Sequence, residues 1–179
     1  MSSPSRPSPI RRIVTGRGPD GKSDVLFDSV DPHKLVISPP GIEDRVLWLA
    51  DSTPSSIALK DDPVSPQPSI EPPANGSVFR IVDFPPFKRT EVKDDFVRSL
   101  VGGEEAAKGA APHPMMHRTR TLDYAIVLSG EIDMLLESRT VHCKAGDVVI
   151  QQGTTHAWVN KGAEVCRVAF IMIDAVEAR

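Results

Sequence analysis

The sequence lacks the features that mark several large classes of protein. It has no excess of basic residues, because 21 Lys and Arg face 24 Asp and Glu and the net charge at pH 7 is −3. Nothing therefore favours binding to a phosphate backbone or to an anionic membrane. No apolar run approaches the roughly 20 residues that a membrane-spanning helix needs. The amino-terminal residues also carry no apolar stretch, so we expect no secretory signal and a cytoplasmic protein.

Motifs for nucleotide binding and for nucleophilic catalysis are absent as well. Gly16-x-Gly18 lies in a predicted hairpin turn with no helix after it, and no Gly-x-Ser-x-Gly elbow occurs. There are two cysteines, Cys143 and Cys166, and both lie in apolar strand-like segments. We expect them to be buried, reduced thiols.

Proline is distributed unevenly along the 179 residues. Thirteen of the 17 prolines lie in residues 1–75, and a proline-rich chain neither continues helices nor donates to sheet ladders. We expect a disordered amino terminus over residues 1–10. A proline-rich extension over 11–76 follows, with two or three strands, the first two of which form a hairpin.

The remainder, residues 77–179, reads as an all-β domain. A strand is predicted over 77–84, and one short helix over 93–101, where apolar residues follow helical spacing before a Gly-Gly pair. Six short strands then follow between 124 and 174, at spacings of about 8–12 residues with glycine-bearing turns. This pattern predicts an antiparallel sandwich or barrel.

Two sets of residues in this domain have a characteristic spacing. The first set is His117, Thr119, Asp123 and Gly130, and the second is Gly146, Gly153, His156 and Asn160. In this order and spacing the segment resembles the cupin family, a small jelly-roll β-barrel with two motifs. The resemblance implies a single cupin barrel with an amino-terminal β extension that acts on a small molecule. It also implies that metal ligands, where present, occupy these motif positions.

The chemistry of these residue types fits a site inside the barrel. Alternate side chains of a strand share a face, so His117 and Thr119 are expected to point the same way. If Asp123 and His156 also point inward, two imidazoles and one carboxylate meet. That set suits Fe(II), and equally Mn, Ni or Zn. His117, Asp123 and His156 are therefore candidate metal ligands.

Two departures from the family pattern leave alternatives open. Thr119 stands where the family has a histidine, and Asp123 is one methylene shorter than the family's glutamate. Without a metal, His117, Asp123 and His156 would form an acid/base cluster suited to dehydration, isomerisation or decarboxylation. The third alternative is a barrel that binds a ligand or only assembles, without turnover.

Further residues are candidates for contact with the substrate. These are Met116, Thr119, Gln151 and Trp158, of which Trp158 shares the face of His156. An apolar mouth without a basic cluster favours a small organic metabolite, aromatic or polyketide-like, over a sugar phosphate.

Other side chains are predicted to lie outside the barrel. Arg118 and Arg120 alternate with Thr119, Tyr124 follows Asp123, and His142 alternates with Cys143. The extension is expected to pack across a partner's sheet, which would make the protein a homodimer.

Overall fold

The computed structural model describes residues 7–37, 41–57, 60–64, 69–87, 113 and 115–178, and over these ranges its regular secondary structure consists of strands. The predicted helix at 93–101 lies outside the described residues. No described residue belongs to a helix long and apolar enough to cross a membrane. The strands are β1 (Arg11–Arg17), β2 (Ser23–Val30), β3 (Lys34–Ile37), β4 (Ile42–Ala50), β5 (Ser77–Phe84), β6 (Thr121–Ser129), β7 (Glu131–Leu136), β8 (Thr140–Lys144), β9 (Val148–Gln152), β10 (His156–Val159) and β11 (Cys166–Asp174).

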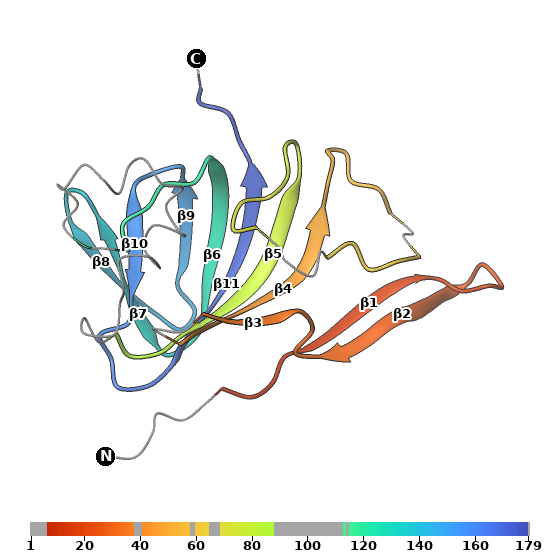
Figure 1. The fold of residues 1–179 in the computed structure, drawn as a ribbon, viewed down its shortest axis with the longest axis horizontal. Coiled ribbons are helices and arrows are strands. Elements are labelled where there is room, and N and C mark those ends of the chain that lie inside the picture. Colours follow the sequence, from red (N-terminus) through yellow and green to blue (C-terminus); the bar gives the residue numbers. More distant parts are fainter. Residues whose placement is uncertain are drawn as a thin grey trace.

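Two antiparallel sheets form the barrel (Figure 1). The larger sheet has the order β3-β4-β5-β11-β6-β9, and the smaller has the order β10-β7-β8. Apolar side chains from both sheets make one buried core, among them Val46, Val168 and Phe170 of the larger sheet and Ile132 and Met134 of the smaller. The all-β barrel predicted from the sequence is confirmed.

The central strand β11 shows why this sequence folds into a sheet with two covered faces. It pairs with β5 on one side and β6 on the other. Val168 and Phe170 belong to the main core, while Ala169 packs in a second cluster on the outer face. A strand buried on both faces needs a nearly continuous apolar run, and residues 168–173 supply it.

The predicted extension contains four strands rather than two or three. The additional strand, β3, is four residues long and lies close to prolines, so its apolar pattern is too short to predict a strand. β3 and β4 join the six-stranded sheet through the pairing of β4 with β5. The predicted hairpin does form: β1 pairs with β2 and lies beyond β4, projecting from the barrel (Figure 1).

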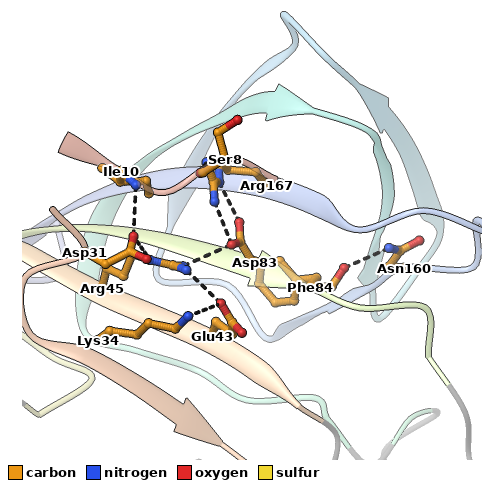
Figure 2. A network of polar contacts seen from close by, with 10 residues as sticks. All are labelled: Ser8, Ile10, Asp31, Lys34, Glu43, Arg45, Asp83, Phe84, Asn160 and Arg167. Carbon is orange, nitrogen blue, oxygen red and sulfur yellow. Dashed lines mark hydrogen bonds and ion pairs between the residues drawn. The ribbon is translucent and has the colours of Figure 1, made fainter. Parts of the chain in front are cut away.

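A network of charged side chains fastens the amino-terminal segment to the barrel (Figure 2). Arg45 donates to Asp31 at 2.7 Å and to Asp83 at 3.0 Å. Arg167 donates two hydrogen bonds to Asp83, at 2.6 and 2.8 Å, and a third to the carbonyl of Ser8 at 2.7 Å. Thus, of the stretch predicted to be disordered, residues 1–6 lie outside the described residues, while Ser8 is bound to β11.

Candidate active site

The site begins with two histidines that lie directly opposite each other. His117 and His156 form an antiparallel bridge in which each backbone N–H donates to the other's carbonyl at 2.9 Å. Residues paired in this way project their side chains to the same side. The two imidazole rings accordingly lie with their centroids 4.6 Å apart, at the β10 edge of the smaller sheet.

Each imidazole is held through its Nδ1 atom. The Nδ1 atom of His117 lies 2.9 Å from the carbonyl oxygen of Met115, and that of His156 lies 2.9 Å from the carbonyl oxygen of Thr154. Burial lowers the pKa of His117, and burial together with the neighbouring His117 lowers the pKa of His156 to about 4. Both rings are therefore neutral at pH 7.

Gln151 contacts His156 and does not line the cavity beside the two histidines. Its Oε1 accepts from the Gly153 N–H at 3.0 Å, which fixes the orientation of the amide. Its Nε2 then lies 3.1 Å from the Thr154 carbonyl and 2.9 Å from Nδ1 of His156. The Gln151 side chain is buried in these contacts and does not line the cavity beside the histidines.

That cavity has a volume of about 120 Å³ and a mainly apolar lining. Of the predicted substrate-binding residues, Thr119 and Trp158 line it. Met116 is buried in the core, and its neighbour Met115 lines the cavity in its place. The apolar lining residues are Ile42, Ile70, Val82, Phe84, Met115, Trp158, Phe170 and Met172.

Asp123 enters the same cavity from β6 with an unusual environment. The residue is 4% exposed, and its Oδ1 has no hydrogen-bond partner among the described residues. Burial raises the pKa of Asp123 to about 6, although Thr121 and Arg80 act in the opposite direction. This carboxyl group therefore changes protonation state close to neutral pH.

The structure brings His117 and His156 side by side, and Asp123 lines the same cavity from the other sheet. The histidines belong to the edge of the smaller sheet, whereas Asp123 lies in the larger sheet. No three His, Cys, Asp or Glu residues within the described ranges are grouped closely enough to hold a metal ion. The hydroxyl of Thr119 accepts a hydrogen bond from Thr121 at 2.8 Å. The donor set thus does not fit a metal site with three protein ligands, and we derive no step through a metal.

Sequence reasoning missed two charged residues of the cavity, Asp44 and Arg80. Arg80 on β5 donates through Nη1 to Asp44 on β4 at 2.8 Å, and both line the cavity. Burial raises the pKa of Asp44 and lowers that of Arg80. Strand alternation could have predicted that both side chains point inward. Asp44 lies between the inward residues Ile42 and Val46, and Arg80 lies between Val78 and Val82.

The side chains predicted to face outward do so. The side chain of Arg118 is 51% exposed, that of Arg120 is 73% exposed and that of His142 is 59% exposed. Tyr124 is also exposed, at 37%. Nδ1 of His142 lies 2.9 Å from the Asp133 carboxylate, and His142 does not line the cavity.

Two further motif residues have structural roles. The Asn160 side chain donates to the carbonyls of Phe84 at 2.9 Å and Glu164 at 2.7 Å (Figure 2 shows the first). Gly130 has φ of +75°, and a Cβ there would lie 2.9 Å from the Val165 carbonyl oxygen. Asn160 and Gly130 therefore stabilise turns of the barrel, and neither residue lines the cavity.

Comparisons with known proteins agree with this architecture. A model of the cupin domain, Cupin_2, matches residues 104–173. "Phomopsin biosynthesis cluster protein C'" of Diaporthe leptostromiformis is 32% identical over 174 residues, which cover 92% of this chain and 78% of that protein. "Cupin-domain-containing oxidoreductase srdD" of Neurospora crassa is 28% identical over 176 residues, covering 94% of this chain and 76% of that protein.

A solved structure of an RmlC-like cupin family protein with a double-stranded β-helix fold, from Methanocaldococcus jannaschii, covers 55% of this chain and 70% of its own. Its TM-score is 0.38 at 12% identity. Relatives of this chain therefore include cupin-domain oxidoreductases and proteins of biosynthesis clusters. The chain has the barrel and the motif positions of a cupin, and it matches these relatives over most of its length. It therefore belongs to the cupin family, as a member with a single barrel.

Proposed function

We propose that this cupin is an enzyme of secondary-metabolite biosynthesis that moves a proton on a small, largely apolar organic substrate, with Asp123 as the acid–base residue. The observation that supports this most is the Asp123 carboxyl group, which is buried in a mainly apolar cavity with Oδ1 unpartnered among the described residues. The metabolic setting is supported by relatives named as phomopsin and oryzines biosynthesis cluster proteins.

The proposed chemistry needs no further reactant. Ionised Asp123 takes a proton from a carbon beside a carbonyl group of the substrate and returns it at another position, which is an isomerisation. If a hydroxyl group leaves as water instead, the same residue supplies the proton and the reaction is a dehydration. The neutral imidazoles of His117 and His156 lie at the cavity wall, where they bind polar atoms of the substrate without adding charge.

A deletion experiment tests this proposal. In the organism of origin, deletion of the gene should cause one metabolite to accumulate, and the purified protein should convert that metabolite in the presence of a chelator. Complementation with Asp123→Asn should fail, whereas Asp28→Asn, an exposed aspartate of the hairpin, should restore the product. Full restoration of the product by Asp123→Asn would overturn the assignment of Asp123 as the acid–base residue.

A redox reaction is the second candidate. Its support is that three relatives, 25–28% identical to this chain, are named cupin-domain-containing oxidoreductases. The accumulated metabolite distinguishes the two candidates, because an isomerisation or dehydration leaves the overall oxidation state of the carbon skeleton unchanged. A product that differs from the metabolite by two hydrogens or by one oxygen would establish the redox reaction.

We also propose that the protein is a homodimer. Apolar side chains stand exposed on the projecting hairpin, with Ile13 at 51% and Val25 at 50%, and on the outer face of the larger sheet, with Val148 at 58% and Ile150 at 52%. Exposed apolar patches can mark interaction surfaces, and in the proposed dimer the hairpin of one copy covers the larger sheet of the other. Sedimentation should give about twice the 19.4 kDa of one chain, and Ile150→Glu should shift it to one. A wild-type protein of one chain would contradict the dimer.

A further inference from the structure

We infer that the Asp44–Arg80 pair is a polar anchor that selects a neutral substrate bearing a hydroxyl group and rejects anionic ones. This inference rests on the proposed function, since it takes the cavity as the substrate site. It assigns a role to two residues that belong to neither cupin motif. Both come from strands that precede those motifs in the chain, β4 and β5.

The register of the larger sheet places these side chains on the inner face. Asp44 pairs with Val82, and Arg80 pairs with Val46, so the two charged residues lie diagonally across neighbouring strands. Asp44 is 7% exposed and Arg80 is 6% exposed. Arg80 uses Nη1 for Asp44 and Nη2 for the Ser69 carbonyl at 2.5 Å. The pair is thus rigidly held in the cavity wall.

Three polar atoms remain unpaired in this wall. Within the described ranges, Nε of Arg80, Oδ1 of Asp44 and Oδ1 of Asp123 have no hydrogen-bond partner. Each unsatisfied buried group costs about 1–3 kcal/mol, and folded proteins retain few of them. All three residues line one cavity, so we place a polar group of the ligand beside these side chains, as the partner that their unpaired atoms lack.

The types of these atoms define the complementary group. The Arg80 Nε–H needs an acceptor, whereas the two carboxylate oxygens need a donor. A hydroxyl group supplies both from one oxygen atom. A purely apolar ligand would supply neither, and it would leave all three atoms without partners.

The charges of the wall oppose an anionic ligand. The lining holds one guanidinium, that of Arg80, and two carboxyl groups, those of Asp44 and Asp123. The guanidinium of Arg80 is already bound to the Asp44 carboxyl group, so it is not free to pair with an anionic ligand. A carboxylate or phosphate placed in this buried site would face uncompensated repulsion in a region of low dielectric constant.

Three small aromatic probes test the anchor without knowledge of the natural substrate. Phenol carries a hydroxyl group, toluene replaces it with a methyl group, and benzoate carries a negative charge. Binding is measured by titration calorimetry on the full chain at about pH 8, where phenol is neutral and benzoate is ionised. We expect phenol to bind at least about tenfold more tightly than either of the others. Equal affinity for phenol and toluene in the wild-type protein would overturn the inference.

Variants then assign the preference to the pair. In Asp44→Leu/Arg80→Met, apolar side chains replace the buried ions, a type of exchange that folds tolerate. The preference for phenol over toluene should fall by at least about tenfold, while toluene binding is retained. Arg80→Lys keeps the charge but removes the Nε–H donor, and it should also lose the preference. The matched control is Arg11→Gln/Asp28→Asn, which removes an exposed ion pair of the hairpin and should leave all three affinities unchanged.

The result separates this inference from the proposed function. A phenol preference that is undiminished in Asp44→Leu/Arg80→Met would show that other groups bind the hydroxyl, and the anchor would be refuted. Asp123→Asn keeps Asp44 and Arg80, so it should still favour phenol over benzoate. If that variant also retains turnover of the accumulated metabolite, the acid–base role fails while the anchor stands.

Discussion

Replacing the candidate acid–base residue with its neutral analogue should stabilise the protein above pH 6. The pKa of Asp123 rises from 3.8 to about 6 on folding because the carboxyl group is buried. The folded state therefore binds this proton more tightly than the unfolded state. Stability from this residue is highest at low pH, falls as the pH rises from 3.8 to about 6, and stays low above that.

The size of the effect follows from the two pKa values. A difference of one pKa unit corresponds to about 1.4 kcal/mol, so full ionisation of Asp123 costs the folded state about 3 kcal/mol. Asp123→Asn removes this cost, and its free energy of unfolding should exceed that of the wild type by about 2–3 kcal/mol at high pH.

Urea denaturation at several pH values between about 4 and 8 measures this difference. The gain from Asp123→Asn should be small at the acidic end and grow as the pH rises. Asp28→Asn, which alters an exposed carboxylate bound to Arg11, should show no such growth. A gain that stays constant over the range, or a loss of stability at pH 8, would refute the assignment of Asp123 as a buried, destabilised carboxylate.

Three more predictions concern residues that stabilise the fold outside the cavity lining. Asp62→Ala should lower the free energy of unfolding at pH 7 by about 2–4 kcal/mol, because it leaves buried Arg12 without its carboxylate at 2.5 Å; a loss below the error of urea denaturation would contradict this. Burial tends to raise the pKa of Asp62, but bonds from Arg12 and neighbouring groups lower it to about 2, so its contribution should disappear as the pH falls from 3.8 to about 2. Gly130→Ala should destabilise the fold by about 2 kcal/mol or more, since φ is +75° and the new Cβ would lie 2.9 Å from the Val165 carbonyl oxygen; an unchanged thermal midpoint would show that the turn relaxes. Burial raises the pKa of Cys166 to about 12, so a thiol reagent should label it only after unfolding, and rapid labelling of the native protein would refute its burial.

The barrel was predictable from the sequence because its signals are local. Alternating apolar residues and glycine turns predict the strands from β6 to β11, and the motif spacing places His117, Asp123 and His156 in one cavity. Alternation also assigns Arg118 and Arg120 correctly to the outside.

The rest of the site depends on contacts between distant segments. Asp44 and Arg80 are 36 residues apart and meet only through the pairing of β4 with β5. His117 and His156 meet through a bridge between residues 39 positions apart, and Asp123 reaches the cavity from the other sheet, which spacing along the chain does not encode. The amide of Gln151 turns toward a neighbouring loop because Gly153 and Thr154 bind it there.

The most direct test of the central claim is turnover of the accumulated metabolite by protein treated with a chelator, with metal content measured by elemental mass spectrometry. Our account predicts that metal-depleted wild-type protein retains its rate, and that Asp123→Asn reduces that rate by at least about 100-fold, the scale of general acid–base catalysis. A rate that disappears with the metal and returns on addition of Fe(II), Mn(II), Ni(II) or Zn(II) would contradict it and establish a metal enzyme.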